Sequence, residues 1–503
     1  MEILLTQCLP LMFALFLFIF AVIKTVKVPS NLPPGPWQLP FIGNIHQLVG
    51  SLPHRILKDL ADKYGPIMSL KLGEVSAVVV SSPEFAQEIM KTHDVSFADR
   101  PHLLSGELLA YNSSDILLSP YGEYWRQMRK ICTLEVFSAK CVQKFEPIRK
   151  EEVENLIKIV SQNEGSAVNI SELLFSLTTG VTARAVLGKK IKDTEVFASF
   201  LRETVELSSG FGVADIYPSL KFLHLISGVQ GKLEKLHVKI DRILENIISD
   251  HRDRKSGVEH QDLIDVLLSI QKQGYLQPAL PDKNIKAVIL GIVSAGSETS
   301  SITMTWAISE MLRNPRVMEK AQAELRKVFD SGVDIDETRL HELNYLKMVV
   351  KEALRLHPPT PLSIPRECRQ QCQINGFNIP VKTKVLVNVW AIGRDPKDWA
   401  DAESFMPERF ENSSVDFRGT DFEYLPFGAG RRICPGMLFS LPAMLLPLAH
   451  LLYHFDWKLP GGLKSEELDM TEAYGVTCGR KHDLYVVPTA YTPQKMAKAN
   501  TTF

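Results

Sequence analysis

The feature that most constrains this chain is an uncharged segment close to its N-terminus. Residues 3–23 contain no charged side chain, and a helix of this length, rising about 1.5 Å per residue, spans the hydrocarbon core of a bilayer. Glu2 precedes the segment, Lys24 and Lys27 follow it, and no small-residue cleavage site is present. We therefore expect residues 1–23 to remain as a single transmembrane anchor, with the rest of the chain in the cytosol by the positive-inside rule.

A basic and proline-rich hinge over residues 24–40 follows the anchor. Four prolines lie between residues 33 and 40, and each fixes its own φ and holds the preceding residue extended, which makes a short stiff tether. An ordinary turn is the alternative reading of these prolines. Residues 41–503 contain no repeat, low-complexity run or second linker, so a single domain is the simplest interpretation.

Charge and cysteine content exclude some classes of protein. Lys plus Arg number 57 against 58 for Asp plus Glu, so the net charge does not favour a nucleic-acid partner. The seven cysteines have no CxxC pairs, which argues against a disulfide framework or a zinc site and indicates a reducing compartment.

Hydrophobic periodicity predicts a mainly α body with small β-sheets. The pattern predicts amphipathic helices over residues 145–160, 229–250 and 314–329, and a long proline-free helix over residues 282–313 that crosses the core. β-Formers cluster in residues 67–72, 75–80 and 384–389, where we expect strands.

The run from Phe427 to Gly436 carries the strongest chemical signal. Cys434 stands between Gly430 and Gly436, and Arg432 precedes it by two residues. Glycines let the backbone approach a flat cofactor and turn N–H groups toward the sulfur, while the arginine can neutralise a propionate. A thiolate ligand to haem iron favours O–O cleavage. The alternative is a glycine-rich surface loop with an incidental cysteine.

A second polar run, residues 295–300, lies midway along the long predicted helix. Glycine and hydrogen-bonding side chains weaken a helix interior and can admit water. Cleavage of reduced O₂ needs two protons, for which Thr299 and Glu298 form a plausible hydroxyl and acid relay. A helix N-cap or a polar kink is the alternative.

The cysteine run matches every fixed position of the pattern FxxGxRxCxG, and here the chain resembles the cytochrome P-450 superfamily. The resemblance extends over the anchor, the hinge, Trp125 to Arg129, Glu352 to Arg355 and Pro407 to Phe410. The hinge and residues 121–126 are similar to plant endoplasmic-reticulum members of specialised metabolism. The resemblance implies the cytochrome P-450 fold, haem b with Cys434 as the axial iron ligand, and electrons from NADPH-cytochrome P-450 reductase.

The resemblance also assigns roles to other residues. It implies that Trp125, Arg129, Arg366 and Arg432 contact the haem propionates, and that Phe427, Gly430 and Gly436 shape the loop around the cofactor. It gives Glu352, Arg355 and Arg409 a structural role behind the haem. The basic residues that it suggests for reductase docking are Arg126, Lys130, Lys140, Lys144 and Arg431.

Positions that line the pocket in the family are mostly apolar here. They are Leu103, Leu104, Leu108, Leu109, Ile289, Ile292, Val293, Leu362, Ile364 and Val476. An apolar cavity favours a hydrocarbon-like substrate; we expect oxygen insertion from O₂ into a sesqui- or diterpene, with an alkaloid or phenolic as the alternative. A haem-thiolate isomerase or dehydratase, and a haem sensor or electron carrier, are the competing functions.

Two departures from the family pattern stand out. Ser297 and Glu298 replace the Thr and Asp that plant members mostly carry, which affects relay geometry more than the type of chemistry. Pro442 lies in the helix predicted after Cys434, where it removes a donor and clashes with the carbonyl of Leu438 at a cost of ~3 kcal/mol. We expect that helix to kink or to start late, with Pro442 as a tolerated defect.

Overall fold

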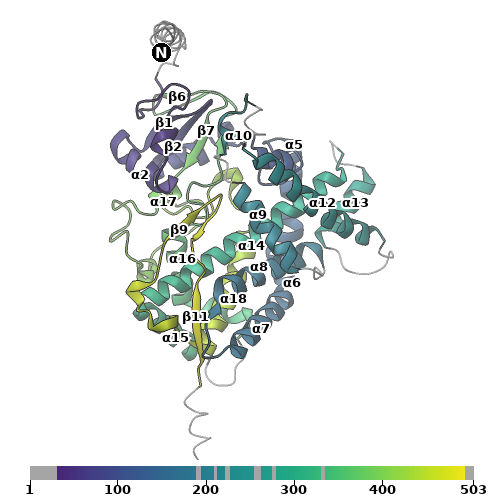
Figure 1. Cartoon of the computed structure of the whole chain (residues 1–503), viewed down its shortest axis with the longest axis vertical. Helices are drawn as coiled ribbons and strands as arrows, with labels where there is room; N and C mark the ends of the chain where they lie inside the picture. Colours follow the sequence, from purple (N-terminus) through teal and green to yellow (C-terminus); the bar gives the residue numbers. More distant parts are fainter. Residues whose placement is uncertain are drawn as a thin grey trace, which may run out of the picture.

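The computed structural model describes residues 31–188, 194–208, 212–220, 227–253, 262–274, 279–329 and 335–492. The expected transmembrane helix lies outside the described residues. A large helical body fills most of the molecule, and a small sheet region lies at the end where the N-terminus enters (Figure 1). This arrangement confirms a mainly α fold with small sheets.

The helices and strands have the following bounds. The helices are α2 (Pro53–Tyr64), α3 (Pro83–Gln87), α4 (Leu104–Leu108), α5 (Glu123–Cys132), α6 (Ala139–Lys144), α7 (Glu146–Gln162), α8 (Ile170–Leu187), α9 (Thr194–Leu207), α10 (Val213–Ile216), α12 (Val229–Arg252), α13 (Leu263–Gln273), α14 (Asp282–Arg313), α15 (Pro315–Val328), α16 (Asn344–Leu356), α17 (Val389–Ile392) and α18 (Met437–His454). The strands are β1 (Ile67–Leu72), β2 (Val75–Val80), β3 (Val168–Asn169), β4 (Arg366–Glu367), β5 (Cys372–Ile374), β6 (Phe377–Ile379), β7 (Lys384–Val387), β8 (Phe455–Lys458), β9 (Glu472–Tyr474), β10 (Cys478–Arg480) and β11 (Tyr485–Ala490).

The core is built around α14, which crosses the middle of the body and packs on α8, α16 and α18 (Figure 1). Helices α8, α14 and α18 are long and apolar enough to cross a membrane by length and composition alone, yet 72%, 67% and 56% of their most apolar windows are buried inside the fold. Packing in the protein core therefore accounts for their hydropathy.

A four-stranded sheet in the order β1-β2-β7-β4 forms the region near the N-terminus. β1 and β2 pair antiparallel with Ile67 opposite Val80, and β7 joins β2 in parallel. The first two strands have the predicted bounds. The third ends at Val387, two residues early, because the side chain of Asn388 accepts the Ala391 N–H and caps α17.

A buried ion cluster joins α16 to the turn at residues 407–410. Arg355 donates to both carboxylate oxygens of Glu352, at 2.8 Å each, and Arg409 donates to the same carboxylate at 2.9 Å. Both Glu352 and Arg355 have side chains that are 0% exposed. This geometry supports the structural role expected for the three residues.

The helix after Cys434 differs from the expectation of a late start. α18 runs without interruption from Met437 to His454 and contains both Pro442 and Pro447. Pro442 is the sixth residue of α18, two residues beyond the first four, and Leu438, whose carbonyl would accept the missing hydrogen bond, is 50% exposed. Water can therefore reach the neighbourhood of that carbonyl, which lowers the cost of the missing hydrogen bond.

Candidate active site

A cavity of about 330 Å³ lies between α14, the cysteine loop and three connecting segments. The connecting segments are residues 100–118, residues 359–366 and the turn at residues 475–477. Cys434, Thr299 and Glu298 all line this one cavity. The fold thus brings the Cys434 thiol to the same cavity as the hydroxyl of Thr299 and the carboxyl of Glu298, which precede it in the chain by 135 and 136 positions.

The loop around Cys434 is shaped by its glycines and its backbone hydrogen bonds. The Cys434 N–H donates to the Phe427 carbonyl at 3.0 Å, closing the loop. Gly430 has φ +69°, and an added Cβ would lie 2.0 Å from the Met90 carbonyl oxygen, so only glycine fits. An added Cβ at Gly436 would meet only ordinary contacts, so its contribution is its backbone N–H.

The electrostatics of the loop act on the sulfur in opposite directions. Burial raises the pKa of the Cys434 thiol, whereas the N–H groups of Gly436 and Met437 and the positive charge of Arg129 lower it. N–H groups aimed at sulfur stabilise a thiolate. A metal ion bound to the sulfur would complete the deprotonation, because a coordinating thiol loses its proton.

Four arginines, Arg100, Arg129, Arg366 and Arg432, line one part of the cavity. Burial and, second, the charge of Arg366 lower the pKa of Arg432 to about 10. Burial also lowers the pKa of Arg100, followed by the charges of Arg432 and Arg366. The Arg432 Nη1 atom is buried without a hydrogen-bond partner. Such a cluster needs anions, and the two propionates of haem meet that need.

Trp125 supports this cluster from outside the cavity. Its Nε1 donates to the Ile116 carbonyl at 3.0 Å, and the Arg432 guanidinium lies 4.2 Å from its ring centroid. Trp125 is absent from the cavity lining, and its indole N–H is bonded to Ile116; its direct contact with a propionate stays a prediction. Its effect on the site passes through Arg432 by a cation–π contact.

The polar run on α14 does not interrupt the helix, which excludes the N-cap alternative. Thr299 Oγ1 donates to the Ala295 carbonyl at 2.8 Å, and Ser297 Oγ donates to the Val293 carbonyl at 2.7 Å. Ser297 is buried, whereas Thr299 and Glu298 line the cavity. The hydroxyls thus bond within the helix instead of breaking it.

Glu298 is the ionisable group of this run. Burial raises the pKa of its carboxyl; the charge of Arg202 lowers it, the charge of Glu206 raises it, and a hydrogen bond from Thr477 lowers it. A carboxyl with a raised pKa keeps its proton to a higher pH than an ordinary glutamic acid. This property suits a general acid.

Six of the ten predicted apolar lining residues face the cavity. They are Leu103, Leu109, Ile292, Leu362, Ile364 and Val476. Leu104, Leu108, Ile289 and Val293 instead pack in or against the neighbouring core, so their prediction was wrong. On α14 the reason is the helical period, since Leu290, Ser294 and Ala295 occupy the face toward the cavity and Ile289 and Val293 the face beside it.

Comparison with known proteins decides the family. The cytochrome P450 family model matches residues 33–485. The chain belongs to the cytochrome P450 family. P450 proteins are haem-thiolate proteins, so the predictions of the fold and of haem with an axial cysteine are confirmed.

Relatives of known name extend over nearly the whole P450 chain. It is 53% identical to premnaspirodiene oxygenase of Hyoscyamus muticus over 96% of this chain and 98% of the relative. It is 52% identical to germacrene A hydroxylase of Barnadesia spinosa (98% and 99%) and to desmethyl-deoxy-podophyllotoxin synthase of Sinopodophyllum hexandrum (94% and 95%). A zebra fish cytochrome P450 solved with progesterone superposes with a TM-score of 0.77 at 25% identity, over 88% of this chain and 100% of that chain.

Two polar residues of this P450 site were missed by the sequence reasoning. Arg100 donates to the carbonyls of Leu117, Ile364 and Pro365 at 2.6–2.9 Å, and so joins two walls of the cavity. Asp115 lines the cavity, and its Oδ1 accepts the N–H groups of Leu117 and Leu118. Burial raises the pKa of Asp115 to about 6.

Proposed function

We propose that this P450 inserts one oxygen atom of O₂ into a sesquiterpene hydrocarbon or a similar apolar terpenoid. The second oxygen atom leaves as water, and two electrons from NADPH, delivered through NADPH-cytochrome P-450 reductase, together with two protons balance the reaction. The observation that carries the proposal is that Cys434, Thr299 and Glu298 line one largely apolar cavity.

Cys434 is the residue that would hold haem iron, and Arg100, Arg129, Arg366 and Arg432 would bind the propionates. Haem with a thiolate ligand supplies the activation and cleavage of O₂. Cys478 is a poor alternative ligand, because it does not line the cavity.

Protons for the reaction would come from Glu298 and Thr299. Burial raises the pKa of the Glu298 carboxyl, which therefore keeps its proton to a higher pH than an ordinary glutamic acid. At rest, the Thr299 hydroxyl donates its proton to the Ala295 carbonyl, and its oxygen keeps lone pairs that can accept a proton. During proton delivery this hydroxyl would rotate, so that its own proton points into the cavity. This pair disfavours a haem-thiolate isomerase, dehydratase, sensor or electron carrier, because none of these functions needs proton delivery to O₂.

The terpenoid assignment rests on the lining and on the relatives. The cavity walls carry leucine, isoleucine and valine side chains from many segments of the chain, and premnaspirodiene oxygenase and germacrene A hydroxylase act on sesquiterpenes. The similarity to desmethyl-deoxy-podophyllotoxin synthase is nearly as high. It keeps a phenolic or alkaloid substrate as the second candidate.

The domain layout of the proposal follows the sequence. Residues 1–23 would form a single transmembrane helix in the endoplasmic reticulum, residues 24–40 a hinge, and residues 41–503 the cytosolic monooxygenase domain. The five basic residues suggested for reductase docking are all exposed. Four of them lie on α5 and α6, and Arg431 lies in the cysteine loop, as expected for a reductase that approaches the cysteine side.

Product analysis tests the proposal. The full chain would be co-expressed with a plant reductase, and its microsomes supplied with NADPH and a panel of sesquiterpenes, diterpenes, phenolics and alkaloids. The expected result is a product that gains one oxygen atom from labelled O₂ with a sesquiterpene, and no product without NADPH. Turnover confined to a phenolic or alkaloid would overturn the substrate class, and rearrangement of hydroperoxides without NADPH would overturn the monooxygenase assignment.

A further inference from the structure

One wall of the cavity, residues 103–113, has an unusual backbone and is named the strained wall. Four of its residues, including Leu109 and Ala110, line the cavity. The next three residues, 111–113, have φ values of +49°, +60° and +54°. Left-handed backbone is unfavourable for residues that carry a Cβ, and it persists where contacts with the surrounding fold compensate for the strain.

Tyr111 ties the strained wall to two long helices. Its hydroxyl donates to Asp241 Oδ1 of α12 at 2.6 Å, and Lys286 Nζ of α14 lies 2.6 Å from the same oxygen. The Tyr111 ring also meets the His237 ring of α12 edge-on, with 4.8 Å between the centroids. Lys286, whose side chain is 8% exposed, pairs with Glu245 at 2.7 Å as well. Asp241 is thus the point where the strained wall, α12 and α14 are joined.

The negative charge of Asp241 strengthens this tie. Burial would raise the pKa of its carboxyl, but the hydrogen bonds from Lys286 and Tyr111 lower the pKa below its ordinary value. The group is therefore ionised at neutral pH, and a hydrogen bond to a charged acceptor is stronger than one between neutral groups. Because Tyr111 directly follows Leu109 and Ala110 in the chain, the tie holds two residues of the lining in place.

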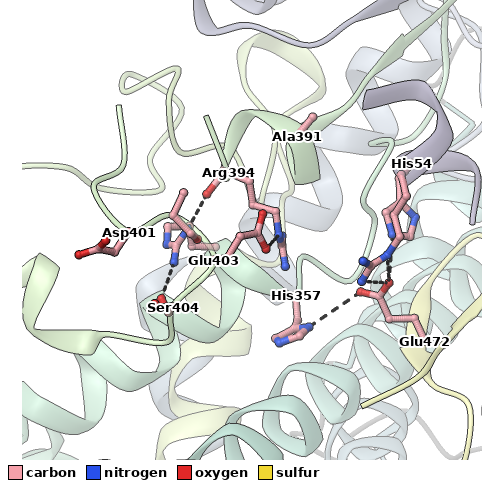
Figure 2. A network of polar contacts seen from close by, with 12 residues as sticks. His54, His357, Ala391, Arg394, Asp401, Glu403, Ser404 and Glu472 are labelled. Atoms are coloured by element: carbon pink, nitrogen blue, oxygen red, sulfur yellow. Dashed lines mark hydrogen bonds and ion pairs between the residues drawn. The ribbon is translucent and has the colours of Figure 1, made fainter. Parts of the chain in front are cut away.

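The hairpin of β9 and β10 forms another wall and is held in a different way. Its turn, residues 475–477, lines the cavity. On β9, Oε2 of Glu472 accepts from Arg55 at 2.8 and 3.0 Å and lies 3.2 Å from His54 Nε2 (Figure 2). The side chain of Glu472 is 2% exposed, whereas that of Asp241 is 36% exposed. Water competes more with an exposed tie than with a buried one, so the strained wall loosens more readily than the hairpin.

We propose that Tyr111 is a positioning residue for the substrate: its hydroxyl, held by Asp241, keeps the strained wall in place and thereby fixes which carbon of the substrate is oxidised. The inference rests on the proposed monooxygenase function. An apolar substrate has few polar groups to orient it, so the shape of the wall selects its orientation. The product pattern then depends on a hydroxyl that does not itself line the cavity.

Tyr111→Phe tests the proposal, because it removes the hydroxyl and keeps the ring. The ratio of the main oxygenated product to minor ones should fall by about two- to tenfold, the value of one partly exposed hydrogen bond. KM should rise while kcat changes little, because the wall contributes to substrate binding. Normal ferrous carbon-monoxide spectra would show that the variant is folded and contains haem.

Tyr345→Phe is the matched control. The Tyr345 hydroxyl donates at 3.0 Å to Glu408, a carboxylate that also binds two cations, and neither residue lines the cavity. This variant should keep the wild-type product ratio. Asp241→Ala should shift the product ratio as Tyr111→Phe does, and the double variant should show no further shift. Shifts that add in the double variant would mean that the two residues act separately, against the proposal.

Hydrogen–deuterium exchange gives a readout that needs no turnover. The N–H groups of residues 112 and 113 donate to carbonyls within the strained wall at 2.8–2.9 Å. Tyr111→Phe should speed their exchange by about two- to tenfold, with the hairpin of β9 and β10 unchanged, and Tyr345→Phe should leave both as in the wild type. Unchanged exchange of the wall, or an unchanged product ratio, in Tyr111→Phe would overturn the inference. If the wild type oxygenates no compound of the panel, the proposed function fails instead, and exchange still decides whether the tie holds the wall.

Discussion

Replacing Glu352 by glutamine should destabilise the protein far more than the same change at Glu408. Oε1 of Glu352 accepts from Arg355 Nη2 at 2.8 Å, Arg409 Nε at 2.9 Å and the Met406 N–H at 2.8 Å, and Oε2 accepts from Arg355 Nε at 2.8 Å. Glutamine removes the negative charge and turns an NH₂ group toward donors. Two cations then remain buried without a counter-ion, at a cost of about 3–5 kcal/mol.

Glu408 is the matched control, because it also binds two cations. Arg316 and Lys320 lie 2.6 and 2.7 Å from it, but their side chains are 57% and 48% exposed. Pairs of this exposure contribute about 0.2–1 kcal/mol. Glu408 makes two such pairs, which together contribute about 0.4–2 kcal/mol, so the expected difference between the two variants is at least about 1 kcal/mol, or about fivefold in the unfolding equilibrium.

Guanidinium chloride unfolding measures this difference, followed by tryptophan fluorescence and by the ferrous carbon-monoxide Soret band. Where unfolding is irreversible, the half-life of that band at a fixed elevated temperature replaces the midpoint. Equal losses of stability in Glu352→Gln and Glu408→Gln would refute the reasoning, since burial would then not determine how much an ion cluster contributes to the free energy of unfolding.

Four further predictions test other parts of the site. Cys434→Ser should abolish the long-wavelength Soret band of the ferrous carbon-monoxide complex, whereas Cys478→Ser should keep it, as difference spectra will show. Thr299→Ala should keep haem but lower product per NADPH by about tenfold or more and release peroxide, measured by parallel assays. Burial raises the pKa of Asp115 from 3.8 to about 6; the native chain then holds a proton that the unfolded chain has lost, so stability falls as pH rises between these values, and Asp115→Asn should flatten melting temperature across this window. Pro442→Ala should raise the melting temperature through a gain of up to ~3 kcal/mol with the product unchanged; a lower melting temperature or a loss of haem would show that the proline is required.

The sequence correctly predicted the helices and strands that show a regular hydrophobic repeat within their own residues. The helix at residues 282–313 and the strands at residues 67–72 and 75–80 have the predicted bounds, because each buries a face that repeats with the period of its own backbone. The third strand ends earlier than predicted because the side chain of Asn388 caps α17. The hydrophobic pattern does not contain this information.

The cysteine loop was also predictable, since its glycines, arginine and cysteine lie within ten residues. Arg100 and Asp115 were not. Arg100 contacts Ile364 and Pro365, more than 260 positions away, and Asp115 packs against Gly291, where an added Cβ would lie 3.1 Å from the aspartate Cβ. No spacing within the chain encodes such contacts, and only the fold brings them to the cavity.

The polar run on α14 shows how one pattern can have a different physical cause from the one expected. We expected Gly296 and its neighbours to loosen the helix, but a Cβ at Gly296 would lie 2.8 Å from Thr182 Cγ2, and Thr178 of the same helix α8 donates to the Ser297 carbonyl at 2.8 Å. The glycine therefore permits α8 to approach α14 closely. Because α8 holds one face of α14 in this way, the adjacent face, with Glu298 and Thr299, is fixed toward the cavity, and the relay gains its position from packing and not from a break in the helix.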